Sequence, residues 1–220
     1  MGGAVVLLSA VALAWRRQQA RPRTLPTPVV PTDSVTGLPT RSHFEAVLDD
    51  AVHRCDTDGS ALAVIYLGLD NFRMVNEAYG HATGDRLLAQ VPERLRNAVP
   101  DAVGITRNAG DEFILALPGG RDQAHAAAAR LREALRHNFR IDNQDMTLDV
   151  SMGFALYPQH GARPRLLMQA AAAMRAVKQN GGGAHAEFEP AMGVDMRQQA
   201  EMLRDLRQAV KLGALQLVYQ

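Results

Sequence analysis

Residues 107–115, RNAGDEFIL, decide the fold because they predict a β-hairpin. The turn of this hairpin carries two adjacent carboxylates, Asp111 and Glu112. A short segment at residues 104–108 precedes the turn, and the apolar run FILAL follows it at residues 113–117. The pattern predicts two antiparallel strands joined by a tight turn. Asp111 and Glu112 are then either solvated turn residues or the acidic edge of a metal–nucleotide site.

The composition is that of an ordinary globular protein. The chain has 220 residues, of which 47% are hydrophobic and 21% are charged. Its formal net charge is +1, so no overall electrostatic field favours nucleic acid, and we expect no nucleic-acid partner. Cys55 is the single cysteine, which excludes a disulfide within the chain and agrees with a reducing compartment.

The N-terminus carries an uncharged, mostly apolar run at residues 2–15, and four arginines follow within the next eight residues. Fourteen helical residues span about 21 Å, against about 30 Å of bilayer hydrocarbon. We therefore expect residues 1–16 to be the end of a truncated transmembrane helix; the alternative is an N-terminal helix that packs on the domain. The basic residues predict a domain on the cytoplasmic side of the inner membrane.

A proline-rich segment separates this run from the rest of the chain. Residues 21–31 contain four prolines in eleven residues, which excludes a regular helix or a central strand. We expect a linker at residues 17–32 and a globular domain at residues 33–190.

Helical and strand patterns alternate within that domain. The order argues for an α/β sandwich with an antiparallel hairpin at its centre. Ser42 is expected to cap the first helix, and Gly153 to mark a bulge or a close approach within a strand. Helices are predicted at residues 42–54, 72–78, 84–99, 121–139 and 165–178, and strands at residues 61–69, 104–108, 112–117, 146–157 and 184–188.

The last thirty residues form a separate predicted unit. Asp195 is placed to cap a helix whose apolar spacing continues to Val210, and residues 214–219 then alternate like a strand. The predicted strand ends the chain without a partner, so we expect residues 191–220 to be a connector helix and the first strand of a truncated domain.

Several stretches together resemble the GGDEF family, the diguanylate cyclase domains of bacterial cyclic-di-GMP signalling. The resemblance covers about residues 33–190 and implies a nucleotidyl-cyclase-like (ferredoxin-like) fold, in which a mostly antiparallel sheet is flanked by helices and the active-site hairpin lies at residues 105–117. The tail resembles the opening of an EAL domain, the phosphodiesterase that degrades cyclic-di-GMP. The matching stretches are DSVTGLPTR (33–41), LDNFRMVN (69–76), YGH (79–81), GD (84–85), AGDEF (109–113), SMGFA (151–155) and YP (157–158).

The resemblance also implies a reaction and a set of site residues. Such a domain joins two GTP molecules with Mg²⁺ or Mn²⁺ and acts as a homodimer. The metal would be held by Asp111, which forms the catalytic pair with Glu112. The implied nucleotide-binding residues are Asn76 and Asp85 at the guanine, Lys178 at a phosphate, and Gly110 in the turn.

Three positions depart from the family pattern. Gly68 stands where a metal-binding strand carboxylate is expected, and Ala109 replaces the first glycine of the motif. Residues 181–183 are three glycines where a Gly-Arg-Asn step is usual, so one phosphate-binding cation is lost. Asp70 lies two residues, roughly 7 Å, beyond position 68, so we do not expect it to replace the missing ligand.

Three functions stay open on the sequence alone. The first is a degenerate GGDEF domain with weak or absent catalysis that binds GTP and regulates a following EAL phosphodiesterase. The second is an active diguanylate cyclase, and the third is a dimerisation or interaction module without nucleotide. Ordinary structural roles also remain for Asp85 near a helix N-terminus and for Lys178 in the last turn of a helix.

Overall fold

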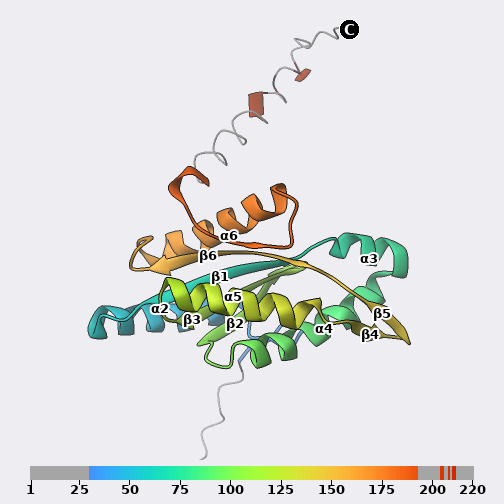
Figure 1. The fold of residues 1–220 in the computed structure, drawn as a ribbon, viewed down its shortest axis with the longest axis horizontal. Helices are drawn as coiled ribbons and strands as arrows, with labels where there is room; N and C mark the ends of the chain where they lie inside the picture. Colours follow the sequence, from blue (N-terminus) through green and yellow to red (C-terminus); the bar gives the residue numbers. More distant parts are fainter. Residues whose placement is uncertain (1–29, 193–203, 206–207, 209, 212–220) are drawn as a thin grey trace, which may run out of the picture. The chain divides into compact units, whose positions relative to one another are not determined.

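The computed structural model describes residues 30–192, together with residues 204, 205, 208, 210 and 211 (Figure 1). The predicted membrane segment at residues 1–16, nearly all of the predicted linker and most of the predicted EAL-like tail lie outside the described residues. Within the described part of the chain, no helix is long and apolar enough to cross a membrane.

A five-stranded sheet forms the centre of the domain, in the order β2-β3-β1-β6-β7. Strand β1 is antiparallel to both β3 and β6, and β7 is parallel to β6. The predicted mostly antiparallel α/β architecture is therefore confirmed. The helices are α2 (Arg41–Asp58), α3 (Phe72–Tyr79), α4 (His81–Ala98), α5 (Arg121–Arg136) and α6 (Arg163–Gln179); the strands are β1 (Leu62–Leu69), β2 (Gly104–Ala109), β3 (Glu112–Pro118), β4 (Phe139–Ile141), β5 (Gln144–Met146), β6 (Val150–Tyr157) and β7 (His185–Glu187).

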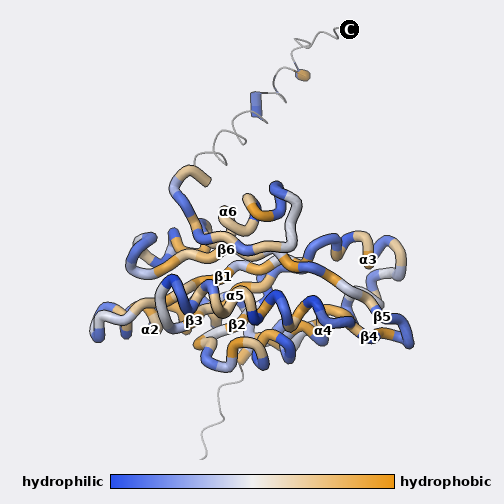
Figure 2. The backbone as a smooth tube through the Cα atoms, viewed as in Figure 1, coloured by the Kyte–Doolittle hydropathy of each residue, from blue (hydrophilic) through white to orange (hydrophobic). Residues whose placement is uncertain are grey.

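Strand β1 is buried at every position because helices cover both faces of the sheet. Its odd-numbered side chains pack with residues of α4 and α5, and its even-numbered ones with residues of α2 and α6. Figure 1 shows α6 and α5 on opposite sides of the sheet, and in Figure 2 β1 is largely hydrophobic whereas the helices alternate in hydropathy. This explains the continuous apolar run of its sequence.

Some predicted boundaries are wrong. Helix α2 begins at Arg41 after Thr40, so Ser42 is not its cap, and α4 begins at His81 and not at residue 84. The predicted strand at 146–157 begins at Val150. The predicted helix at 121–139 ends at Arg136, and β4 and β5 then form a small hairpin that was not predicted.

Gly153 confirms the expected close approach. A Cβ atom added there would lie 2.0 Å from the backbone nitrogen of Met174 and 2.3 Å from the carbonyl oxygen of Ala170. Helix α6 therefore lies directly on β6, and no side chain fits between them. This contact fixes the helix whose last turn carries Lys178 close to the end of β1.

Candidate functional site

The hairpin between β2 and β3 brings Asp111 to the end of β1. Ala109 pairs with Glu112, so Gly110 and Asp111 form a two-residue turn, and Gly110 has a φ of +55°. On the other side, Gly68 pairs with Glu112, and the backbone N–H of Leu69 donates to the carbonyl oxygen of Asp111 at 3.2 Å. Position 68 and the hairpin acid therefore lie side by side, as the resemblance implies.

Lys178 meets Asp111 at this junction. Its ammonium nitrogen lies 3.5 Å from Oδ2 of Asp111 and 3.5 Å from the carbonyl oxygen of Leu69. The two side chains are 35% and 30% exposed, so each retains access to a ligand in solution. A partly exposed pair of this kind contributes little to folding.

The missing side chain at Gly68 leaves the space that Lys178 occupies. A Cβ atom at position 68 would lie 2.7 Å from Nζ of Lys178 and 2.8 Å from its Cε. An aspartate there would have to displace the ammonium group. The site thus holds a cation where the family pattern has an anion.

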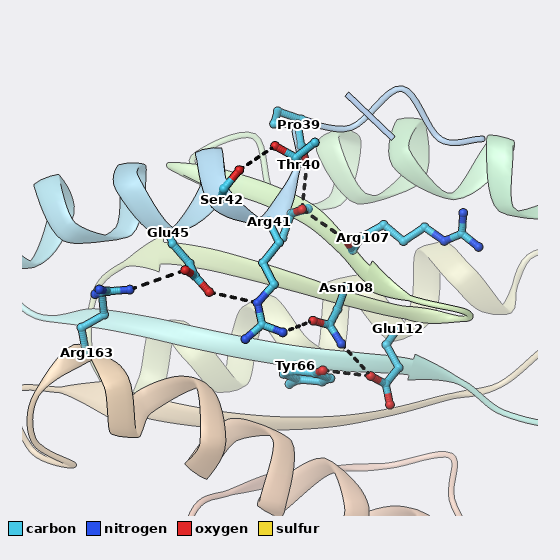
Figure 3. Close-up of polar contacts among 11 residues, drawn as sticks. Pro39, Thr40, Arg41, Ser42, Glu45, Tyr66, Arg107, Asn108, Glu112 and Arg163 are labelled. Atoms are coloured by element: carbon cyan, nitrogen blue, oxygen red, sulfur yellow. Dashed lines mark hydrogen bonds and ion pairs between the residues drawn. The ribbon is translucent and has the colours of Figure 1, made fainter. Parts of the chain in front are cut away.

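Glu112 has different partners from its neighbour Asp111. Its Oε2 accepts hydrogen bonds from the hydroxyl of Tyr66 at 2.8 Å and from Nδ2 of Asn108 at 3.1 Å, and Arg41 donates to Asn108 in turn (Figure 3). Burial, together with the hydrogen bond to this carboxylate, raises the pKa of Tyr66 far above its ordinary value. The tyrosine therefore remains a donor to Glu112.

A β-bulge aims Asn108 at this network. The pairing of β2 and β3 shifts between Arg107 and Ala109, which leaves Asn108 as the extra residue. Tyr66 and Asn108 were not among the residues predicted from the sequence to support the hairpin acid. The available signal was the alternation of β1, which places Tyr66 on the same face of the sheet as Gly68.

A shallow pocket of about 370 Å³ opens beside the turn and contains three of the predicted site residues. Asn76 is half-buried on α3, and a Cβ atom on Gly84 would lie 2.0 Å from its Oδ1, so a side chain at position 84 would collide with the amide. The residues that line the pocket are Phe72, Arg73, Asn76, Glu77, His81, Gly110 and Asp111. The structure thus brings Asn76, Gly110 and Asp111 together.

Asp85, like Glu112 and Lys178, is a predicted site residue that does not line the pocket. It is exposed in the second turn of α4. His81, one turn earlier on the same helix, is a lining residue that the prediction left out. The guanine contact of Asp85 stays a prediction.

The carboxylate of Asp70 holds a loop in place. Its carboxylate accepts hydrogen bonds from the hydroxyl of Ser151 at 2.7 and 2.9 Å and from the N–H of Gly183 at 2.8 Å. The glycines at 181–183 all have positive φ, at 103°, 73° and 63°. The glycine run therefore allows a tight loop to close on Asp70.

The donor set does not fit a magnesium site. Mg²⁺ requires near-octahedral oxygen ligands at about 2.0–2.1 Å, commonly from one or two carboxylates. Asp111 and the Leu69 carbonyl supply two oxygens, but the ammonium of Lys178 lies between them and position 68 has no ligand. Among the residues described, no group of three or more histidine, cysteine, aspartate or glutamate side chains is placed to hold a metal.

Comparison with known sequences agrees with this geometry. The family described as "Diguanylate cyclase, GGDEF domain" matches residues 30–184. MucR of Pseudomonas aeruginosa, a bifunctional diguanylate cyclase/cyclic di-GMP phosphodiesterase, is 37% identical over 191 residues, which are 86% of this chain and 28% of MucR. The cyclic di-GMP phosphodiesterase PdeR of Escherichia coli is 35% identical over 207 residues, 93% of this chain and 30% of PdeR. The chain spans less than a third of either relative.

Solved structures show the same fold. The GGDEF domain of TpbB from Pseudomonas aeruginosa matches with a TM-score of 0.72 at 28% identity, over 76% of this chain and 99% of that one. A sensory box/GGDEF protein from Caulobacter crescentus matches with a TM-score of 0.62 at 37% identity, over 68% and 99% of the chains. GGDEF domains generally bind GTP with Mg²⁺ and often form dimers. This chain belongs to the GGDEF family of cyclic-di-GMP signalling domains.

Proposed function

We propose that this domain binds GTP, has weak or no cyclase activity, and regulates an EAL phosphodiesterase that follows it in a longer protein. The observation that carries the proposal is the ammonium of Lys178 in the space where a carboxylate at position 68 would lie. A pocket with Asn76 in its wall lies beside Asp111, which supports nucleotide binding, whereas the end of Lys178 fills the space next to Gly68.

The loss of catalysis follows from the charge that the reaction develops. When a 3′-hydroxyl attacks an α-phosphorus, negative charge accumulates on phosphoryl oxygens, and divalent cations normally stabilise it. One lysine supplies a single positive charge, which Asp111 at 3.5 Å partly neutralises. This site therefore binds a nucleotide better than it stabilises the transition state.

The regulatory part of the proposal rests on the tail and on the relatives. Residues 191–220 resemble the opening of an EAL domain, and MucR, NbdA and PdeR are each named as a cyclic di-GMP phosphodiesterase. We accordingly assign residues 33–190 to the GGDEF domain, residues 17–32 to a linker and residues 1–16 to the end of a membrane anchor. A structural change on GTP binding would then be transmitted through the connector helix to the EAL phosphodiesterase.

Isothermal titration of the full chain with GTP tests the binding. We expect saturable binding that Asn76→Ala weakens about tenfold, because a hydrogen-bonding group would be lost from the pocket wall. Asn97→Ala is the matched control, since Asn97 is exposed near the C-terminal end of α4 and does not line the pocket. Absence of binding up to millimolar GTP would overturn the proposal and favour an interaction module without nucleotide.

An active homodimeric cyclase is the second candidate. It is favoured by Asp111, which the hairpin presents at the end of β1, and by the bifunctional relative MucR. It predicts cyclic-di-GMP from GTP and Mg²⁺ or Mn²⁺ at the rate of an ordinary cyclase, which chromatography of the products would detect.

A further inference from the structure

We propose that GTP binds to this site without a divalent cation, because the ammonium of Lys178 takes the place of the metal. The inference rests on the proposed GTP binding and adds the identity of the cation. It concerns this chain in particular, since it depends on the glycine at position 68.

Two oxygens converge on Nζ of Lys178, as ligands would converge on a metal. They are Oδ2 of Asp111 and the carbonyl oxygen of Leu69, each at 3.5 Å. The backbones of the two residues are held together, because the N–H of Leu69 donates to the carbonyl oxygen of Asp111. An ammonium group has three N–H donors and no acceptor, so it suits this arrangement of oxygens.

The path of the lysine side chain depends on the absence of a side chain at Gly68. A Cβ atom there would lie 2.7 Å from Nζ and 3.4 Å from the sulfur of Met174. Helix α6 packs directly on β6 at Gly153, and the atoms nearest to position 68 are the end of the flexible Lys178 side chain, which can move more easily than the helix. Any larger residue at position 68 must therefore turn the lysine out of this position.

The ammonium group retains an open side for a ligand. The Lys178 side chain is 35% exposed and Asp111 lines the pocket that Asn76 also lines. A phosphate group that reaches Asp111 from this pocket would lie within contact distance of the ammonium, because the ammonium nitrogen is 3.5 Å from Oδ2 of Asp111. A compact ammonium binds phosphate as a point charge, which requires no further ligand.

The test is a titration of the full chain with GTP in two buffers, one with EDTA and one with excess Mg²⁺. We expect dissociation constants that agree within threefold. Binding seen with Mg²⁺ and lost in EDTA would overturn this inference and leave the proposed GTP binding intact. Absence of binding in both buffers would overturn both.

Two variants at position 68 sharpen the result. Gly68→Asp displaces the ammonium and adds a second carboxylate beside Asp111, so we expect GTP binding to become at least tenfold tighter with Mg²⁺ than with EDTA. Gly68→Ala displaces the ammonium without adding a ligand, so it should weaken binding equally in both buffers. Equal affinities of Gly68→Asp in the two buffers would contradict the assignment.

Variants of the lysine complete the test. Lys178→Met keeps the length of the side chain and removes its charge, and we expect it to weaken binding in EDTA at least tenfold, whereas Lys178→Arg should restore part of the loss. Lys178 is partly exposed, so thermal unfolding of both variants should match the unmodified chain. Unchanged affinity of folded Lys178→Met would overturn the role given to the ammonium.

Discussion

Asp33 anchors the turn that opens the domain, and its carboxylate makes the stability of the domain depend on pH. Burial alone would raise the pKa of Asp33, but hydrogen bonds from the side chain and backbone of Thr36, and the guanidinium of Arg107, outweigh it and lower the pKa. A carboxyl group with a lowered pKa stabilises the fold above its unfolded pKa. That contribution is lost as the pH falls through the folded pKa.

We therefore expect Asp33→Asn to lower the free energy of unfolding by about 1 kcal/mol at pH 7, because charged hydrogen bonds are lost. The difference from the unmodified chain should shrink as the pH falls below about 4, where the native carboxyl becomes protonated. Urea unfolding at pH 7 and pH 3 measures both values. An equal difference at the two pH values would contradict this assignment.

Gly110, and not residue 109, is the turn residue that needs a left-handed backbone conformation. Gly110 has a φ of +55°, whereas Ala109 does not have a positive φ and pairs with Glu112 as part of β2. The departure at Ala109 thus leaves the turn intact. We expect Gly110→Ala to cost about 1–2 kcal/mol of stability in urea unfolding, with Ala109→Ser as a control that costs less than about 0.5 kcal/mol.

At the scale of elements, the contact between β6 and α6 determines where the site cation lies. Gly153→Ala would place a Cβ atom 2.0 Å from the backbone of Met174, so the helix must shift or the domain must unfold. We expect a loss of about 3 kcal/mol or more in urea unfolding. Gly120→Ala is the control, since its Cβ would lie 3.8 Å from the nearest atom; a similar loss in both would contradict the packing argument.

The sequence predicted the large elements correctly because each buries a continuous apolar run or a helical stripe. The hairpin of β4 and β5 was missed because its strands have three residues each and half of it is exposed. Its signal was the pair Asp142 and Asn143, which adopt φ values of 51° and 64° in the turn. Aspartate and asparagine tolerate this conformation, so the pair was a turn signal.

At the scale of the whole molecule, the site joins segments that are far apart in the sequence. The motifs predicted that Asn76, Gly110 and Asp111 belong to one site, and the pocket contains all three. The resemblance also identified Gly68 as a missing ligand. It could not predict that Lys178 occupies the vacant space, because that depends on how closely α6 approaches β1 and on the absence of a Cβ atom at position 68.

The central claim is that this GGDEF domain has weak or no cyclase activity because Lys178 lies where a carboxylate at position 68 would be. The most direct measurement is the yield of cyclic-di-GMP when the full chain is incubated with saturating GTP and Mg²⁺, followed by chromatography. We expect little or no product from the unmodified chain relative to an enzyme-free control, and clearly more product from Gly68→Asp. Cyclic-di-GMP from the unmodified chain at the rate of an ordinary cyclase would contradict the account.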